Sequence, residues 1–580
     1  MQPIPKRVAD LKVTPNIVDY DAARRGFSWD AMYRELSWLP DGCLNKAHEC
    51  IDRHAQGARA QKPAMLWEGK GGETETYTFA DFARETNKFA NVLDSLGVTK
   101  GDRVFLFMDR VPECYVGVFG ALKVGAVAGP LFSAFGPEPV KDRLLDSGAK
   151  VLVTQPHLRK KIAEILPQLP DLKYVVVVNK LGRDPDPLAP GDLAYETLMA
   201  GASSEFEIEK TRQYDLSVMH YTSGTTGKPK GAAHCHQAIV QHYATGKWVL
   251  DFHDDDIYWC TADPGWVTGT SYGMFAPWSN GITQLIYEGG FNASAWYKLI
   301  EKYRVTVWYT APTAVRMLMK AGLDVVRKHD LSSLRHVNSV GEPLNPEAVV
   351  WGMEAFKQAI HDNWWQTETG AQLIANYASM EVRPGSMGRP IPGVEAAILD
   401  ANYEPLPAGK DGQLAIRPGW PSMFRTYWKA EEKYNSRFRK GWYITGDQAH
   451  MDADGYFWFQ GRADDVINTA GHLVGPFEVE SVLIEHPAVV EAGVIGKPDE
   501  LAMEVVKAFV ALKDGFTPSD ELRRDIMKFA KSKLAAAVAP REIEFIDSLP
   551  KTRSGKIMRR LLKARELGLP EGDTSTLEED

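Results

Sequence analysis

The feature that most limits the fold of this chain is an alternation of short apolar runs with longer segments of helical period. Apolar, β-branched runs occur at 104–108, 151–154 and 174–178, and longer segments with amphipathic spacing separate them. Parallel strands need crossover connections, and these are usually helices. The sequence therefore predicts an α/β architecture in which parallel strands and helices form layers.

One helix of this pattern can be delimited from both of its ends. Thr78 is predicted to cap the N-terminus, and Gly97 stands where a C-terminal cap belongs. The apolar residues between them that share one face are Phe82, Phe89, Leu93 and Leu96. We expect this face to pack in the core.

A shift in composition at 461–465, with the sequence GRADD, predicts a domain boundary. We expect a large N-terminal domain over 1–463 and a small α+β domain over 464–580. In the small domain Thr517 is predicted to cap a helix that has Pro518 at its first position. Leu522, Ile526 and Phe529 would line one side of that helix. The acidic segment after 567 is predicted to fray.

Composition and charge narrow the classes of protein. The 580 residues are 44% hydrophobic, which is enough for a large core. The net charge is −9 and the sequence has no basic stripe, which argues against nucleic-acid binding. The five cysteines are few and odd in number, as is typical of reduced thiols. The N-terminal segment MQPIPKRVADLKV lacks a signal-like apolar run, and no stretch of about 18 apolar residues occurs. We expect a cytoplasmic protein with no membrane insertion.

A loop rich in glycine and hydroxyl groups, TSGTTGKPKG, spans 222–231. It is not a Walker-type phosphate loop, because Gly227-Lys228 is followed by proline and the required earlier glycine is Thr222. Its backbone N–H groups can nonetheless wrap the phosphates of ATP as an anion nest. A plain flexible turn is the alternative. The candidate ligands of the nucleotide are Thr222, Ser223, Gly224, Thr225, Thr226, Gly227 and Lys228.

Further motifs follow this loop in a fixed order. They are YTAPTAVR (309–316), GEPLNPEA (341–348), DNWWQTETG (362–370), GWYITGD (441–447), GRADDVINTAGH (461–472) and PKTRSGKIMRR (550–560). With these motifs the chain resembles, nearly from end to end, the AMP-forming acetate–CoA ligases of the adenylate-forming acyl-CoA synthetase superfamily. The resemblance implies an N-terminal adenylation domain and a small mobile C-terminal lid domain.

The resemblance also implies how the residues divide the work of adenylation. Lys556 matches the lysine that bridges the acyl carboxylate and the α-phosphate, and Thr367 is implied near that phosphate. Glu368 matches the carboxylate that holds Mg²⁺ on the ATP phosphates, with Thr225 as a lesser partner. Mg²⁺ prefers oxygen ligands together with substrate phosphates. A lone glutamate or lysine would otherwise be interpreted as a solvated surface charge.

Other matched positions are implied to bind the nucleoside. Asp447 resembles the aspartate that accepts both ribose hydroxyls, Arg462 also reaches the ribose, and a turn aspartate is the alternative for Asp447. The segment Gly341, Glu342 and Pro343 resembles the one along the adenine ring, where glycine permits a close approach. The remaining implied ATP or AMP ligands are Asp362, Trp364, Gln366 and Thr367.

The acyl end of the site is implied by four positions that match the alkyl pocket of acetate enzymes, namely Val267, Thr268, Val340 and Trp365. The indole of Trp365 fills space that relatives for longer chains leave open, which implies acetate first and propionate second. One methylene is worth only about 1–3 kcal/mol in such a pocket, so propionate should be excluded only in part. The alternative for Trp365 is an ordinary core aromatic residue.

For the second half-reaction the resemblance implies Asp464 as the hinge, Gly471 beside the pantetheine of CoA, and Lys531 near the CoA nucleotide. A solvated helix lysine is an equal alternative for Lys531. The family generally has arginine after the histidine of the GH step, where it contacts phosphate, but this chain has Leu473. We therefore expect weaker nucleotide binding than in an arginine variant. The alternatives are that His472 or another cation compensates, that the small domain closes differently, or that the balance between adenylate formation and its reversal is shifted.

The sequence thus predicts a ligase that uses ATP, acetate, CoA and Mg²⁺ and forms acetyl-CoA, AMP and pyrophosphate through an acetyl adenylate; the reverse reaction is chemically allowed. The alternatives are a ligase for propionate or another short acid, and a non-catalytic nucleotide- or acyl-CoA-binding regulator. Matched relatives are acetylated at the position of Lys556, which implies a lysine acetyltransferase and a deacetylase as partners. The histidines in AHCHQ match no zinc spacing and are predicted to belong to a strand and to the start of a helix.

Overall fold

Two largely parallel sheets form the N-terminal part of the protein in the computed structural model, which describes residues 1–183, 187–222, 229–469, 472–499, 502–534, 538–552, 556–572, 574 and 577. The first sheet has the spatial order β14 (Ile360–His361), β13 (His336–Ser339), β12 (Val307–Thr310), β10 (Ile257–Cys260), β11 (Thr283–Tyr287), β1 (Pro63–Glu68) and β2 (Thr74–Thr78). The second has the order β20 (Thr426–Tyr427), β9 (Lys230–Cys235), β8 (Leu216–Thr222), β4 (Val127–Leu131), β3 (Arg103–Phe107), β5 (Val151–Thr154), β6 (Tyr174–Val177) and β7 (Leu193–Ala194). The expected parallel strands β3, β5 and β6 are confirmed.

Helices link and cover these strands. Those of the N-terminal region and the second sheet are α1 (Tyr20–Arg25), α2 (Trp29–Arg34), α3 (Arg53–Ala55), α4 (Phe79–Ser95), α5 (Pro112–Lys123), α6 (Pro137–Ser147), α7 (Pro156–Lys161), α8 (Tyr195–Gly201) and α9 (Ile239–Trp248). Those around the first sheet are α10 (Val267–Thr270), α11 (Ala276–Ser279), α12 (Ala293–Tyr303), α13 (Pro312–Ala321), α14 (Leu323–Val326) and α15 (Pro346–Ala355). The predicted alternation of strands and helices is therefore present.

The largest core lies between the two sheets. Helix α5 is buried along its whole length, and its apolar residues join one cluster with Met65 and Trp67 of β1 and Val104 and Leu106 of β3. Strands that are covered on both faces need continuous apolar runs, which explains why the residues 104–107 are all buried.

Helix α4 begins as predicted. The Thr78 hydroxyl accepts a hydrogen bond from the Asp81 N–H, and the Asp81 carboxylate accepts one from the Thr78 N–H, which completes a capping box. Gly97 follows the last turn in a left-handed conformation. Phe82, Phe89 and Leu93 are fully buried and Leu96 packs against the same cluster, so the predicted core face is confirmed.

An antiparallel sheet follows in sequence and carries much of the site. Its order is β15 (Asn363–Trp364), β16 (Ile374–Ala375), β17 (Ser386–Pro390), β23 (Phe457–Arg462), β22 (Trp442–Met451), β19 (Asp411–Ile416) and β18 (Ala396–Leu399), and β21 (Phe438–Arg439) pairs with β22. Helix α16 (Glu431–Asn435) connects the short strand β20 to this sheet.

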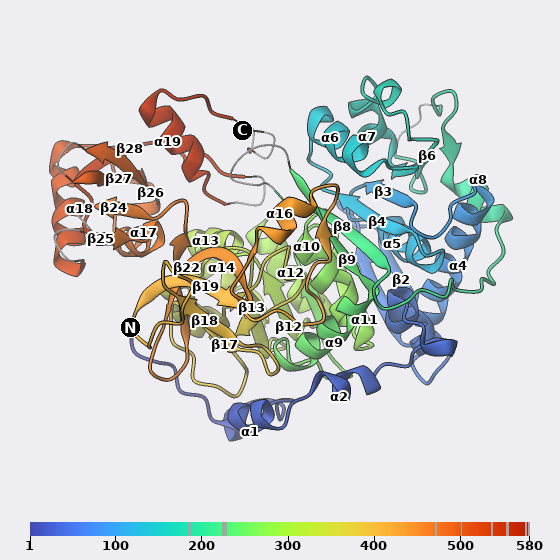
Figure 1. Ribbon diagram of the computed structural model, residues 1–580, viewed down its shortest axis with the longest axis horizontal. Coiled ribbons are helices and arrows are strands. Elements are labelled where there is room, and N and C mark those ends of the chain that lie inside the picture. Colours follow the sequence, from blue (N-terminus) through green and yellow to red (C-terminus); the bar gives the residue numbers. More distant parts are fainter. Residues whose placement is uncertain are drawn as a thin grey trace.

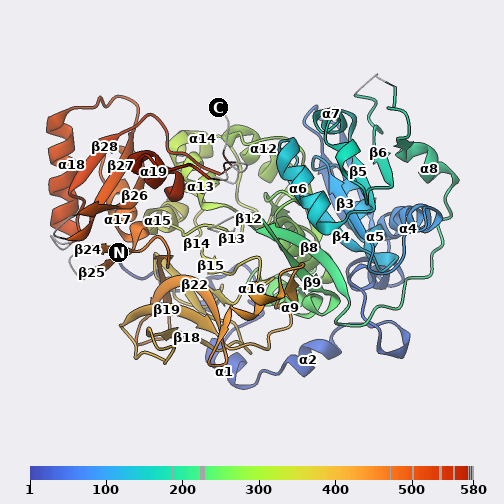
Figure 2. The same cartoon turned by 45° about the horizontal axis from the view of Figure 1, so that its top comes forward.

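The C-terminal region has a sheet and an apolar cluster of its own. Its elements are β24 (Ile467–Thr469), β25 (His472–Val474), α17 (Pro476–Ile484), β26 (Val489–Asp499), β27 (Met503–Leu512), α18 (Asp520–Lys533), β28 (Glu542–Phe545) and α19 (Arg559–Leu567). Figures 1 and 2 show this region at one end of the molecule, opposite β3 to β6. Among the helices in the described part of the chain, none combines the length and the hydrophobicity that crossing a bilayer requires.

One predicted helix start in this region is wrong. Helix α18 begins at Asp520, and its cap is Ser519, whose hydroxyl accepts a hydrogen bond from the Leu522 N–H at 3.1 Å. Thr517 and Pro518 therefore precede the helix. Serine competes well as a cap because its short side chain reaches the free N–H groups of the first turn. Ile526 is buried as expected, and Leu522 and Phe529 are half-buried.

Candidate active site

The strands that carry the predicted phosphate loop form an antiparallel pair. Strand β8 ends at Thr222 and β9 begins at Lys230, and these two residues lie opposite each other in the register. The loop residues between them, Ser223, Gly224, Thr225, Thr226, Gly227 and Lys228, lie outside the described residues. The two strand ends thus fix the position at which the loop leaves and re-enters the sheet.

The segment 366–370 is held as a rigid loop beside these strands. The Phe424 N–H donates to the Glu368 carbonyl at 2.9 Å, and Trp420 Nε1 donates to the Thr369 carbonyl at 2.9 Å. Gly370 has φ of +75°, and a side chain there would bring Cβ within 2.2 Å of the Ser422 carbonyl oxygen. Only glycine fits this approach, so the loop keeps Thr367 and Glu368 in a fixed place.

The Glu368 carboxylate is buried and has one oxygen bonded to protein. Tyr427 Oη donates to Glu368 Oε1 at 2.7 Å, while Oε2 has no hydrogen-bond partner among the described residues. Burial and the Glu368 charge raise the pKa of Tyr427, so the phenol stays a donor. A free carboxylate oxygen suits Mg²⁺, which commonly binds one or two carboxylates together with phosphate oxygens and water. No group of three or more metal-binding side chains occurs among the described residues.

Asp447 and Arg462 lie opposite each other on β22 and β23. Asp447 accepts hydrogen bonds from Arg462 Nη1 at 2.9 Å, Trp364 Nε1 at 2.9 Å and Gln366 Nε2 at 3.0 Å. Burial raises the pKa of Asp447, and the charge of Arg462 opposes this shift. Four of the predicted nucleotide-binding residues are therefore brought into one hydrogen-bonded group.

The GEP segment lies at the end of β13. Gly341 has φ of +96° with open space where a side chain would be, which leaves room for a ligand against the backbone. Glu342 accepts a hydrogen bond from Thr313 Oγ1 at 2.8 Å and pairs with Arg316 Nη2 at 2.8 Å, and Pro343 is half-buried beside it. Asp362 is buried between β14 and β15, where burial raises its pKa to about 8. We expect its carboxyl to be largely protonated at neutral pH.

Lys556 comes from the C-terminal region and lies near enough to the same charges for them to shift its pKa. Its backbone is fixed by a hydrogen bond from its N–H to Thr552 Oγ1 at 3.0 Å. The residue is exposed, although desolvation by nearby protein atoms still lowers the pKa of Lys556. The carboxylates of Glu342, Asp447 and Glu368 raise this pKa and the guanidinium of Arg462 lowers it. The structure thus brings Lys556 together with the predicted nucleotide residues of the N-terminal region.

Trp365 lies among aromatic side chains. Its indole packs edge-on against Tyr272 at 5.1 Å, and Nε1 donates to Tyr309 Oη at 3.3 Å. Tyr309 also donates to Asn363 Oδ1 at 2.9 Å and accepts from Gln372 Nε2 at 3.0 Å, so the phenol is held on three sides. Val340 belongs to the same apolar cluster as Trp365. Val267 and Thr268 are half-buried at the start of α10.

Several other predicted residues lie outside the hydrogen-bonded group around Asp447. Lys531 is exposed on α18, and Gly471 lies outside the described residues. Asp464 Oδ1 is 3.8 Å from Arg462 Nε, immediately before β24. Leu473 lies on β25, opposite Asn468 of β24. His234 lies within β9, which ends at Cys235, and His236 begins a short 3₁₀ helix, so the predicted strand and helix-start positions are confirmed.

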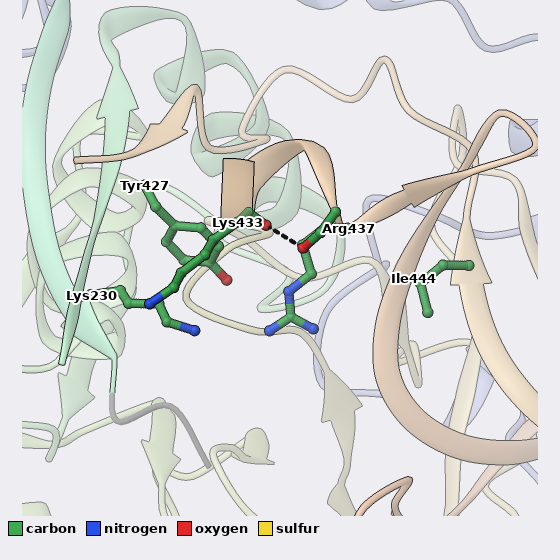
Figure 3. Close-up of a pocket in the computed structure, with 6 residues that line it drawn as sticks. Lys230, Tyr427, Lys433, Arg437 and Ile444 are labelled. Carbon is green, nitrogen blue, oxygen red and sulfur yellow. Dashed lines mark hydrogen bonds between the residues drawn. The ribbon is translucent and has the colours of Figure 1, made fainter. Parts of the chain in front are cut away.

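A pocket of about 260 Å³ beside Glu368 was not predicted (Figure 3). Its lining residues are Lys230, Tyr427, Lys433, Ser436, Arg437 and Ile444. Lys230 lies at the end of the phosphate loop, and its place in the motif TSGTTGKPKG could have identified it as a site residue. Tyr427, Lys433 and Arg437 belong to no motif, because they reach the site through the pairing of β20 with β9.

Comparisons with known proteins identify the family of this chain. The model of the AMP-binding enzyme family matches residues 51–428, and that of the AMP-binding enzyme C-terminal domain matches 478–556. The chain belongs to the AMP-binding enzyme family, whose members pair a large N-terminal domain with a smaller C-terminal one.

Curated relatives match almost the whole chain. Acetyl-coenzyme A synthetase of Bacillus subtilis (strain 168) is 55% identical over 97% of this chain and 98% of its own length. The enzyme of the same name from Methanothrix thermoacetophila is 41% identical over 95% of this chain and 87% of its own length. Among solved structures, the anthranilate CoA ligase AuaEII in complex with anthranoyl-AMP is 32% identical, covers 93% of this chain and 99% of its own and has a TM-score of 0.84. The acyl-CoA synthetase of Brucella canis is 36% identical, covers 95% of this chain and 99% of its own and has a TM-score of 0.75.

Proposed function

We propose that the protein is an AMP-forming acid–thiol ligase that converts acetate, ATP and CoA into acetyl-CoA, AMP and pyrophosphate. The observation that carries this function is the convergence of Lys556, from the C-terminal region, on the charges of Glu342, Asp447 and Glu368. Two anions, a carboxylate and a phosphate, must meet in the first step. A mobile cation beside a nucleotide site can reduce the repulsion between them. Relatives named acetyl-coenzyme A synthetase support acetate as the acid.

In the first step an acetate oxygen attacks the α-phosphorus, the bond from that phosphorus to the bridging oxygen of the β-phosphate breaks, and pyrophosphate leaves. Lys556 lies between the two anions and offsets their repulsion, and Thr367 contacts the α-phosphate. Asp447 and Arg462 hold the ribose, while Gly341, Glu342, Pro343, Asp362, Trp364 and Gln366 surround the adenine. Glu368, with Thr225, would hold Mg²⁺, which supplies positive charge to the phosphates when it is bound.

In the second step the CoA thiolate attacks the acyl carbon of the adenylate and AMP leaves. The small domain, 464–580, is proposed to turn about Asp464 relative to 1–463 and to bring Gly471 and Lys531 to CoA. Movements of this kind complete an active site in stages. The same steps run backwards would make ATP from acetyl-CoA, AMP and pyrophosphate.

The acyl pocket is proposed to consist of Val267, Thr268, Val340 and Trp365, with acetate preferred to propionate. The edge-on contact with Tyr272 and the hydrogen bond to Tyr309 favour one position of the indole. We also place the enzyme in the cytoplasm, because its five cysteines are all free and buried, as is typical of a reducing compartment. A lysine acetyltransferase and deacetylase are proposed to act on Lys556.

The test is acid-dependent exchange of labelled pyrophosphate into ATP, with acetate, propionate and butyrate, followed by addition of CoA. We expect exchange to be strongest with acetate and weakest with butyrate, and thioester to form only when CoA is present. Faster exchange with propionate than with acetate would indicate that the substrate is a different short acid. Absence of exchange with all acids would refute the ligase and favour a nucleotide-binding regulator.

A further inference from the structure

The pocket beside Glu368 is lined by three cations from different elements. Lys230 begins β9, Lys433 lies on α16, and Arg437 follows that helix. Figure 3 shows the charged ends of all three pointing toward the same space below α16, with the ring of Tyr427 between the strand and the helix. Nζ of Lys230 is 5.6 Å from the centre of that ring.

These cations have no paired acid in the described part of the chain. None of the three forms an ion pair within 4 Å there, although the protein as a whole carries a net charge of −9. Desolvation lowers the pKa of Lys230, and the charges of Lys433 and Arg437 lower it further, whereas Glu368 raises it. The three positive charges are thus close enough to repel each other, and a polyanion would relieve that repulsion.

The pocket is linked to the nucleotide site by one hydrogen bond. Tyr427 lines the pocket and donates to Glu368 Oε1 at 2.7 Å. Lys230 lies opposite Thr222, at the point where the chain returns from the predicted phosphate loop. Ribose and adenine ligands, by contrast, cluster around Asp447 and Gly341. The phosphates of ATP that leave as pyrophosphate would therefore extend toward the three cations.

We propose that Lys230, Lys433 and Arg437 form a diphosphate site that binds the β- and γ-phosphates of ATP and then holds pyrophosphate before its release. This inference rests on the proposed ligase function and adds residues from β20 and α16 to it. The diphosphate of CoA has the same chemistry. Pyrophosphate is favoured because the pocket joins Glu368 on the side of the phosphate loop. In the reverse reaction the same cations would capture pyrophosphate as a substrate.

The test is the dependence of ATP–pyrophosphate exchange on pyrophosphate concentration in Arg437→Gln and Lys433→Gln. Losing a charge-assisted contact to phosphate should raise the KM for pyrophosphate about tenfold in Arg437→Gln and severalfold in the exposed Lys433→Gln. The KM values for acetate and CoA should change less than twofold. Arg437→Lys should recover much of the loss, which separates lost charge from lost folding. Arg439→Gln, with the same change of charge two residues away and outside the pocket, is the matched control.

Other results would overturn the assignment. A raised KM for CoA with an unchanged KM for pyrophosphate would show that the pocket binds the diphosphate of CoA instead. Unchanged KM values for both would exclude a diphosphate site. If the unmodified enzyme shows no exchange with any acid, the ligase function is refuted. Calorimetry with pyrophosphate then tests on its own whether the pocket binds a diphosphate. Weaker binding by Arg437→Gln than by Arg439→Gln would support it, and equal binding would refute it.

Discussion

Replacement of Trp365 by glycine should shift the substrate preference of the acyl pocket from short to longer acids. The indole is held by Tyr272 at 5.1 Å and by Tyr309 at 3.3 Å, so its removal opens a space bounded by side chains that have their own partners. Burying one methylene is worth about 0.8 kcal/mol. Hexanoate has four more methylenes than acetate, so it would gain about 3 kcal/mol, or roughly a hundredfold in kcat/KM relative to acetate.

The assay is acid-dependent pyrophosphate exchange with acids from acetate to octanoate. We expect kcat/KM for acetate to fall and that for hexanoate to rise, so that their ratio changes by at least a hundredfold. The variant should also lose about 3 kcal/mol of stability, because a large aromatic side chain is removed from a packed cluster. Trp351→Gly is the matched control, since Trp351 packs edge-on against Phe356 at the same 5.1 Å but lies on α15. An unchanged ratio of acetate to hexanoate in Trp365→Gly would refute the reasoning.

Three further predictions concern charge. Leu473→Arg should strengthen ATP and AMP binding about tenfold by adding a charge-assisted phosphate contact, and unchanged calorimetric affinities would refute this. Lys556→Gln should abolish acetate-dependent pyrophosphate exchange but still convert added acetyl adenylate to thioester, because only the first step needs the bridging cation; retained exchange would contradict it. Burial, with the facing carboxylate of Glu485, raises the pKa of Glu347 to about 7. The folded protein therefore binds an extra proton between about pH 4.5 and 7, and this contribution to stability is lost as pH rises through 7. The melting temperature of Glu347→Gln should thus increase relative to the unmodified protein from pH 5 to pH 8, and a constant difference would argue against this pair.

Local signals in the sequence were enough for some elements. Helix α4 was delimited correctly because its cap, its apolar period and its final glycine all agree. The start of α18 was misplaced because Thr517 and Ser519 are competing caps and Pro518 favours a first helical position, and only the hydrogen bond from the Leu522 N–H decides between the two caps. Periodicity gives the type of element more reliably than its first residue.

The residues of the site also fall into those that the sequence predicts and those that it does not. Asp447, Arg462 and Gln366 were found from motifs, and their mutual hydrogen bonds bring them together. Tyr427 and Arg437 were missed because their place depends on the pairing of β20 with β9, about 200 residues apart in sequence. Tyr309, which holds the indole of Trp365, lies inside a quoted motif, but its contact is visible only in three dimensions.

The connection between β23 and β24 has a consequence for how Lys556 stays near the proposed nucleotide site. Strand β23 ends at Arg462 and β24 begins at Ile467, so a very short tether joins the two regions. Contacts across them include a hydrogen bond from Asn345 Nδ2 to Ser481 Oγ at 3.1 Å, but also the two facing acids Glu347 and Glu485, which repel each other once both are ionised. A weak contact of this kind can persist when a tether supplies an effective concentration in the millimolar range. Cutting the chain between these strands should therefore dilute the lysine away from the nucleotide, even though both fragments keep their own apolar clusters.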